Sequence, residues 1–504
     1  MEQERCLEIL YEGKERIAVE GDIIVPDVKA DVLKVLQVDA SCHITDKGIT
    51  SGGIFLEGIL NVNILYIPDG EDESTGCIKA SFDFRDRFEL GDIDDSAKLA
   101  ISSDVIKIDF TLLNSRKLAI KSAVCVEYEV IGSKQNKINQ CEIGEGAECI
   151  CDCFVENAIA CNDDGEFIIQ DSIEIPSTRV SAKEILKTDA KISNKEIKAV
   201  SGKVIVKGVV NVCVLYLTCD GGVDFCESEF PFTEVFDLYN CDPNDECSVK
   251  LSICDITSSL EPDSESDMRI INIECLVGAS VRANCYNEIN WTSDCYYVGK
   301  DTQLIYDERE VNCFGGRIQQ QKSIKEIIVP DTNLPPVMRI YNVIAELDGT
   351  RMISNNGEVD VETRLKVYVL YLTDNKKCAV YSFKKDIPLS FNFSCDTARE
   401  GMKVNYNCCI DHISYNMNSM GEIELRCIID FDICLGEKKK IRVISDVNVC
   451  DKTDKNDIII YFAKDGDTLW SVAKKYAVKV DDICKINSLE SDSVLTGQKL
   501  LIPC

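Results

Sequence analysis

The sequence predicts a mainly β protein: three antiparallel β-sandwich- or barrel-like domains, each with a short helix, and then a small βααβ unit. First, a signature Ile-x-(Ile/Val)-Pro, followed at a fixed distance by a strand ending in Leu-Tyr, occurs three times. Second, the stretches behind each signature alternate apolar and polar residues, which is typical of strands with one buried face. Third, residues 461–503 break this pattern.

The spacing of the signature gives the length of the repeated unit. Proline and tyrosine are 40 residues apart in the first two copies (Pro26–Tyr66 and Pro176–Tyr216) and 41 in the third, and the prolines lie 150 and 154 residues apart. This period suits one domain and is too long for a solenoid repeat. The predicted organisation is repeat 1–132, linker 133–168, repeat 169–284, linker 285–322, repeat 323–443, hinge 444–457 and a C-terminal unit at 458–504.

A short helix is predicted directly after each signature proline. Proline cannot donate to a β ladder, so it suits the end of a strand. Val32, Val35 and Leu36 then share one helical face, and the same spacing recurs from Ala182. The third copy begins this stretch with a Pro-Pro pair, which fits the first turn of a helix.

Strands follow in each copy. In the second copy, alternate positions from Val204 to Tyr216 carry valine, glycine or tyrosine. Polar turns (PDGEDESTG, TCDGG and TDNKK) end the Leu-Tyr strands, phenylalanine-bearing strands come next, and two more strands close each copy. Short strands joined by Gly, Asn and Asp turns favour an antiparallel sandwich or barrel.

Charge and hydropathy exclude several classes of partner. The 55 basic and 87 acidic residues give a net charge of −32, which repels nucleic acid and anionic lipid. The charge either favours a basic partner or is a solubilising charge spread over all domains. No window reaches the ~18–20 apolar residues of a membrane span, and residues 1–21 lack a signal-peptide core. We therefore expect a cytoplasmic protein.

The 28 cysteines are expected to be mostly reduced in that compartment. The densest group, Cys149, Cys151, Cys153 and Cys161, lacks the paired CxxC spacing of structural zinc sites, so no metal is expected there. Elsewhere a thiol such as Cys213 occupies an alternating strand position, where it behaves as a small apolar side chain. Oxidative cross-linking in an assembled layer stays open.

No catalytic residue, no metal ligand and no cofactor are predicted. The two histidines, His43 and His412, occupy unmatched positions in different copies, which excludes a repeated histidine-based triad. The chain contains no GxxxxGK[ST], GxSxG or HExxH motif. These observations indicate that the protein is not an enzyme.

The C-terminal unit is predicted to fold as strand, helix, helix, strand. Asp465-Gly466-Asp467 forms a turn in which Asp467 or Thr468 can cap a helix, and the apolar face of that helix begins at Leu469. Two aspartates, at 481 and 482, suit the start of a second helix. Gly497 then turns the chain into a last strand, 499–502.

These residues resemble a LysM domain, through GDTLWSVAKKY, Asn487 and GQKLLIP. LysM domains typically bind N-acetylglucosamine polymers in a shallow groove, which the resemblance places at the loops 465–469 and 489–495. The implied partner- or glycan-binding residues are Asp465, Gly466, Asp467, Thr468, Leu469, Trp470, Leu489, Ser491, Asp492 and Val494. Physical reasoning favours Trp470 as core, and Asp465 and Asp467 as turn and cap residues. Ala477 departs from the glycine usual at the end of the first helix, at a cost of about 1 kcal/mol.

The triplicated part, about 20–445, resembles SPOCS domains of sporulation and coat-assembly proteins, through its Ile-x-Val-Pro and Val-Leu-Tyr signatures. SPOCS copies followed by LysM are similar to SipL-type spore-coat morphogenetic proteins. The resemblance implies a mother-cell scaffold that helps to encase the forespore, with LysM contacting the SpoIVA-like coat-basement ATPase and SPOCS copies contacting other coat proteins. A peptidoglycan- or N-acetylglucosamine-binding cell-wall protein and a LysM-targeted wall hydrolase are the alternatives.

Overall fold

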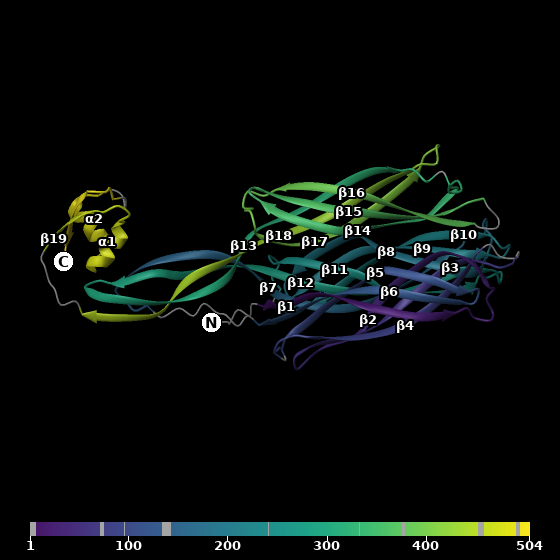
Figure 1. The fold of residues 1–504 in the computed structure, drawn as a ribbon, viewed down its shortest axis with the longest axis horizontal. Helices are drawn as coiled ribbons and strands as arrows, with labels where there is room; N and C mark the ends of the chain where they lie inside the picture. The colour runs from purple at the N-terminus through teal and green to yellow at the C-terminus, as the bar shows by residue number, and fades with distance from the viewer. Residues whose placement is uncertain are drawn as a thin grey trace. The chain divides into compact units, whose positions relative to one another are not determined.

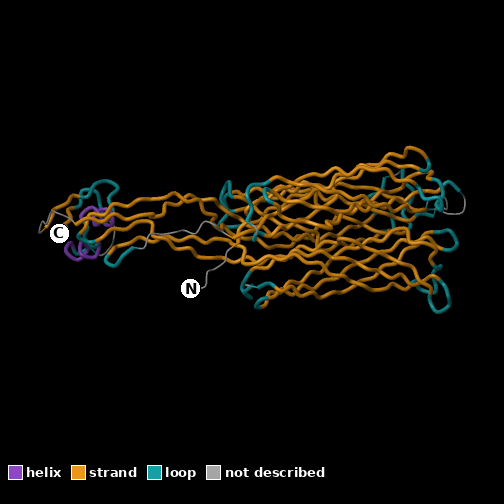
Figure 2. Tube along the Cα trace, turned by 90° about the horizontal axis from the view of Figure 1, so that it is seen from below, coloured by secondary structure: helices purple, strands orange, loops and turns teal. Residues whose placement is uncertain are grey.

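The computed structural model describes residues 7–70, 75–94, 96–133, 143–239, 241–331, 333–374, 379–451, 458–489 and 494–503 (Figure 1). They divide into two compact units. Unit 1 comprises Met1–Lys134, Ala158–Cys285 and Gly316–Leu435, and unit 2 comprises Gln135–Asn157, Tyr286–Gly315 and Gly436–Cys504. Strands dominate both units, and the two helices of the described residues are close in sequence near the C-terminus (Figure 2). The prediction of a mainly β fold is confirmed.

Each copy consists of six strands. The first copy has β1 (Leu7–Ile24), β2 (Val32–Thr50), β3 (Gly53–Pro68), β4 (Gly76–Glu89), β5 (Lys98–Asn114) and β6 (Lys117–Ser133). The second has β7 (Ala147–Glu174), β8 (Ala182–Val200), β9 (Lys203–Thr218), β10 (Val223–Asp237), β11 (Glu246–Pro262) and β12 (Met268–Tyr297). The third has β13 (Lys300–Ile328), β14 (Arg339–Asn355), β15 (Glu358–Leu372), β16 (Val380–Ser394), β17 (Lys403–Met417) and β18 (Ile423–Asp451).

The six strands of a copy form two antiparallel layers. In every copy the second, third and fourth strands make one sheet, and the first, sixth and fifth strands make the other. Leu60 and Val62 of β3 share one buried cluster with Leu118 and Val124 of β6, so the two layers enclose a common core. Between the first two copies, β1 and β7 join the second layers into one six-stranded sheet of order β11-β12-β7-β1-β6-β5.

The short helices predicted after each signature proline are wrong: these residues are strand in the first two copies, and in the third Pro335, Pro336 and Val337 form a loop before β14. In β2 the register with β3 shifts between Val32 and Lys34 and again between Val35 and Gln37. The second copy shifts at the equivalent places, from Ala182 to Glu184 and from Ile185 to Lys187. Each bulge inserts one residue and reverses the alternation of faces. Two bulges three residues apart therefore place apolar residues at a spacing of three, which imitates a helix.

The stretches predicted as irregular linkers also contain regular strand. β7 runs through residues 147–168, and β12 and β13 cover most of 285–322. Many side chains there are exposed, so the apolar alternation used to recognise strands is weak. In the predicted hinge, β18 continues to Asp451, and residues 452–457 lie outside the described residues.

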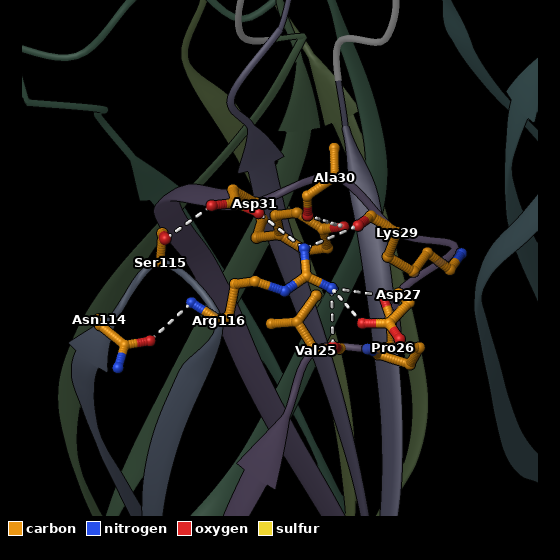
Figure 3. Close-up of polar contacts among 10 residues, drawn as sticks. Val25, Pro26, Asp27, Lys29, Ala30, Asp31, Asn114, Ser115 and Arg116 are labelled. Carbon is orange, nitrogen blue, oxygen red and sulfur yellow. Dashed lines mark hydrogen bonds and ion pairs between the residues drawn. The ribbon is translucent and has the colours of Figure 1, made fainter.

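An arginine holds the loop after the signature proline in the first copy. Figure 3 shows Arg116 pointing into the loop between β1 and β2. Its guanidinium donates to the carbonyl oxygens of Val25 at 3.0 Å, Pro26 at 2.9 Å and Lys29 at 3.3 Å, and to Asp31 Oδ1 at 2.7 Å. Buried or crowded carbonyls need such donors. The guanidinium therefore supplies partners for three carbonyls of the loop where the chain leaves one layer and enters the other.

The second copy uses the same device, and the third does not. Arg269 Nη1 donates to the carbonyls of Pro176 at 3.1 Å and Arg179 at 2.8 Å. Arg116 and Arg269 each stand two residues before the first buried residue of the sixth strand, where the third copy has Gly421.

In the first and third copies, the tyrosine of the Leu-Tyr signature also contacts this loop. The Tyr66 hydroxyl donates to the Ala30 carbonyl at 3.2 Å, and the Tyr371 hydroxyl donates to the Pro335 carbonyl at 3.0 Å. In the second copy Tyr216 is as deeply buried, and its hydroxyl lies 3.4 Å from a carboxylate oxygen of Asp224.

The three copies share an apolar cluster within unit 1. It contains Leu65 and Cys77 of the first copy, Leu186, Cys213, Leu215, Leu217 and Phe225 of the second, and Tyr341, Leu370, Leu372 and Val380 of the third. Beside it, the Lys187 ammonium lies 2.8 Å from Asp39 and 3.3 Å from Asp189, with 4% of its side chain exposed. Burial alone lowers the pKa of Lys187, but the two carboxylates outweigh it and raise that pKa.

Candidate functional site

The C-terminal unit forms the predicted βααβ arrangement. It consists of β19 (Ile458–Phe462), α1 (Leu469–Tyr476), α2 (Val480–Asn487) and β20 (Lys499–Pro503), and β19 pairs antiparallel with β20. Its core contains Leu469, Val472, Ile483, Leu500 and Ile502. The apolar face expected from the spacing in α1 is therefore the face that is buried.

The loop before α1 is built by its own side chains. Thr468 caps the helix, accepting a hydrogen bond from the Ser471 backbone N–H at 3.1 Å, and the Ser471 hydroxyl accepts from the Thr468 N–H at 3.0 Å. Asp467 Oδ2 accepts from the Lys464 N–H at 2.8 Å and the Tyr461 hydroxyl at 2.6 Å. Hydrogen bonding to Tyr461 lowers the pKa of Asp467, and the same bond raises the pKa of Tyr461 to about 12. Asp467 thus has a turn-forming role, as predicted.

Asn487 holds the last strand against α2. Its amide nitrogen donates to the carbonyls of Ile483 at 2.8 Å and Leu501 at 2.7 Å, and its Oδ1 accepts from the Leu501 N–H at 2.7 Å. An asparagine side chain can satisfy one donor and one acceptor of the same strand residue in this way. The residue that marked the family resemblance is therefore structural.

Ala477 ends α1 in the left-handed conformation, with φ 55° and ψ 43°. Its side chain is buried, and its carbonyl accepts from the Gly299 N–H at 2.7 Å. Gly299 lies in the turn that joins β12 to β13, which belongs to the same unit. A segment of the second and third copies thus contacts the βααβ fold.

That contact centres on Trp470. Its ring packs on Tyr296 with centroids 5.0 Å apart and planes at 66°, and its Nε1 donates to Asp294 Oδ2 at 2.8 Å. Lys474, one helical turn later, forms an ion pair with Asp294. The Tyr296 hydroxyl donates to the Val478 carbonyl at 2.8 Å. We call residues 294–299 the β12–β13 turn segment; it covers the outer face of α1.

Asp294 is the polar centre of this contact. Besides Trp470 and Lys474 it accepts a hydrogen bond from the Tyr306 hydroxyl at 3.2 Å. Burial alone would raise the pKa of Asp294, but the hydrogen bonds from Lys474 and Trp470 prevail and hold it below the usual 3.8. The sequence contains no local signal for this group, since Asp294 lies 176 residues from Trp470.

Several described residues of the two loops expected to form the groove are exposed. Asp465, Gly466 and Thr468 are exposed in one, and Leu495 is 76% exposed in the other. The remaining predicted groove residues fall in different places. Leu469 is in the core, Leu489 and Val494 pack partly buried against it, Trp470 faces the β12–β13 turn segment, and Ser491 and Asp492 lie outside the described residues.

Charge separates this unit from the remainder of the chain. Residues 458–504 hold six lysines and six acidic residues, so the net charge of −32 belongs to residues 1–457. The unit is therefore neutral overall, but its two groove loops hold four of its six acidic residues, Asp465, Asp467, Glu490 and Asp492.

Comparison with known proteins also separates the C-terminal unit from the repeated copies. Residues 31–113, 181–261 and 336–418 match the family described as SipL, SPOCS domain, and residues 463–503 match the LysM domain. The chain thus carries three SPOCS domains of the kind found in SipL and a C-terminal LysM domain. Each SPOCS match covers the second to fifth strands of a copy. The SPOCS copies indicate a sporulation-related function, and the LysM domain indicates binding to peptidoglycan or an N-acetylglucosamine polymer.

The curated relatives match in a short region. The probable endopeptidase p60 of Listeria innocua serovar 6a is 51% identical over 39 residues in the LysM region, which is 8% of either chain. The uncharacterized protein YkzQ of Bacillus subtilis strain 168 is 37% identical over 43 residues, which is 8% of this chain and 57% of that protein. This chain therefore spans less than two thirds of either relative, and no solved structure matches it.

SPOCS and LysM domains are non-catalytic binding domains, and the match to p60 does not extend beyond LysM. Among the residues that the structure describes, no helix has both the length and the apolar character needed to span a membrane.

Proposed function

We propose that this SPOCS-repeat protein is a non-enzymatic scaffold for spore-coat assembly, which acts in the mother-cell cytoplasm at the forespore surface. Its LysM domain docks to a SpoIVA-like coat-basement ATPase, and its SPOCS copies contact other coat proteins. One observation carries the proposal: the outer face of α1 is used within the chain, against Asp294 and Tyr296, while the loops at 465–468 and 494–497 stay exposed. A domain that is held to its own chain through one face, and whose loops elsewhere are exposed, is suited to docking a partner.

The polar residues shared by the copies support a scaffold rather than an enzyme. Arg116 and Arg269 bind loop carbonyls, and Tyr66 and Tyr371 do the same. These recurring arginines and tyrosines stabilise the loop backbone, and the two histidines of the chain stand at unmatched positions in different copies. Three similar copies on one chain can instead combine weak contacts through high effective concentration.

Glycan binding is the second candidate, favoured by the LysM match and by the p60 and YkzQ matches. The groove loops contain a 76% exposed Leu495 beside the exposed Thr496 and Gly497. An apolar side chain at that position suits either the face of a sugar ring or a protein surface. The two candidates predict different results when soluble N-acetylglucosamine oligomers are added. The oligomers should displace a glycan from the LysM domain and should not displace a docked protein.

The test uses the full chain and purified coat-basement ATPase in a biolayer interferometry titration. Leu495→Glu, which places one negative charge in the loop, is expected to weaken binding at least about tenfold, or ~1.4 kcal/mol. Lys485→Gln is the control, since it changes the charge by the same amount at an exposed position on α2. Equal affinity for both variants, or complete displacement by the oligomers, contradicts the proposed docking.

A further inference from the structure

Three potential metal ligands meet where the first two SPOCS copies contact each other. His43 comes from β2, Glu166 from β7 and Cys254 from β11, and their ligand atoms all lie within 4.8 Å of one another. His43 and Glu166 are 123 residues apart along the chain, and Glu166 and Cys254 are 88 residues apart, so the three do not form a recognisable sequence motif. His43 is one of two histidines in the chain.

The backbone around Cys254 is shaped to bring these groups together. The register between β11 and β12 shifts between Ile253 and Asp255, so Cys254 is the extra residue of a β-bulge. Bulges re-aim a side chain and are frequent at functional sites.

A glycine beside the bulge leaves the space into which the thiol extends. β12 lies between β11 and β7 in the sheet, and Gly278 of β12 pairs with Ser252. A Cβ at Gly278 would lie 2.7 Å from Cys254 Sγ and 3.3 Å from Ser252 Oγ. Any larger residue at this position would displace the thiol from the place where it meets Glu166 and His43.

The donor set selects the class of metal. Imidazole nitrogen, thiolate sulfur and carboxylate oxygen are the three donor types of zinc sites, whereas Ca²⁺ and Mg²⁺ prefer oxygen alone. Zinc–ligand distances of about 2.0–2.3 Å place neighbouring tetrahedral ligands about 3.3–3.7 Å apart. The 4.8 Å limit exceeds these separations by about 1–1.5 Å, a difference that side-chain rotation of the exposed Glu166 and the half-buried His43 and Cys254 can close.

We propose that His43, Glu166 and Cys254 form a binding site for Zn²⁺ or a similar thiophilic divalent ion at the junction of the first two SPOCS copies. Three protein ligands leave the fourth position to water or to a ligand from outside. Because the ligands come from both copies, the bound ion links β2 of the first copy to β7 and β11 of the second. Metal binding then stabilises this junction by mass action.

The experiment titrates the full chain, reduced and treated with chelator, with Co²⁺, which replaces Zn²⁺ and absorbs visible light. One equivalent is expected to give tetrahedral d–d bands and a thiolate-to-cobalt charge-transfer band, and Zn²⁺ should remove both. Cys254→Ser is expected to abolish the charge-transfer band, and His43→Gln to shift the d–d bands and weaken binding at least tenfold. Unchanged far-ultraviolet circular dichroism confirms that the variants fold.

Two matched variants control for the other thiols and the other imidazole. Cys219→Ser changes an exposed cysteine, and His412→Gln changes the exposed second histidine, so both should leave the spectrum unchanged. As a second readout, Zn²⁺ is expected to raise the thermal unfolding midpoint of the unsubstituted chain and not of His43→Gln. Absence of a thiolate band in the unsubstituted chain, or a band that persists in Cys254→Ser, overturns the proposal.

Discussion

The ion pair between Asp294 and Lys474 is predicted to stabilise the contact between LysM and the β12–β13 turn segment. The side chains are 25% and 30% exposed, and Asp294 also accepts hydrogen bonds from Trp470 and Tyr306. A hydrogen bond to a charged group contributes about 1.5–3 kcal/mol net, and partial exposure places this pair at the lower end. Asp294→Ala, which removes an acceptor from three donors, should cost unit 2 about 2–4 kcal/mol.

A double-mutant cycle isolates the pair. Asp294→Ala combined with Lys474→Met should show a coupling energy of about 1–2 kcal/mol. The chain offers a matched control in Asp482 and Lys485, a pair at 3.8 Å on α2 whose side chains are 50% and 77% exposed. The same substitutions there should couple by less than about 0.5 kcal/mol.

Tryptophan fluorescence during denaturant unfolding is the assay, because both tryptophans of the chain, Trp291 and Trp470, belong to unit 2. Release of the contact should also expose the Trp470 indole and shift its emission to longer wavelength. The reasoning is refuted if the Asp294–Lys474 coupling equals that of the control pair, or if Asp294→Ala leaves both emission and unfolding midpoint unchanged.

Four further outcomes are expected. The pKa of Asp294 is lowered in the folded chain, so the stabilisation from its carboxylate is complete above about pH 4 and is lost as the pH falls through the folded pKa. The stability of unit 2 should therefore depend less on pH in this acid range in Asp294→Ala. Lys187→Met leaves Asp39 and Asp189 without their buried cation and should destabilise unit 1 by about 3–5 kcal/mol in denaturation followed by circular dichroism. Arg116→Ala removes four hydrogen bonds from the signature loop and should cost about 1.5–3 kcal/mol, whereas Gly421→Ala, at the equivalent place in the third copy, tests only the strain of a left-handed glycine. Asn487→Ala should cost the LysM domain about 1–3 kcal/mol, because it leaves the N–H and carbonyl of Leu501 unpaired, and unchanged fluorescence unfolding would contradict that role.

Local sequence patterns predicted the LysM domain well. The Thr468 cap, the turn role of Asp467, the buried face of α1 and the place of Asn487 all depend on neighbours within a few residues or on one short strand pair. Propensity and periodicity act over that range, so a single sequence is informative.

The sequence patterns failed where the structure depends on distant strands. The spacing of Val32, Val35 and Leu36 is produced by two bulges against β3, and nothing local distinguishes that from a helical face. Asp294 meets Trp470 and Lys474 only because the β12–β13 turn segment packs on α1. Both cases require knowledge of which strands or surfaces meet.

The most direct test of the docking scaffold is a binding titration of the full chain against purified coat-basement ATPase, with and without N-acetylglucosamine oligomers. The account predicts saturable binding that persists in the oligomers, that weakens at least about tenfold in Leu495→Glu and that is unchanged in Lys485→Gln. Binding to the oligomers alone, or equal affinity in both variants, would contradict a protein-docking role for the exposed LysM loops.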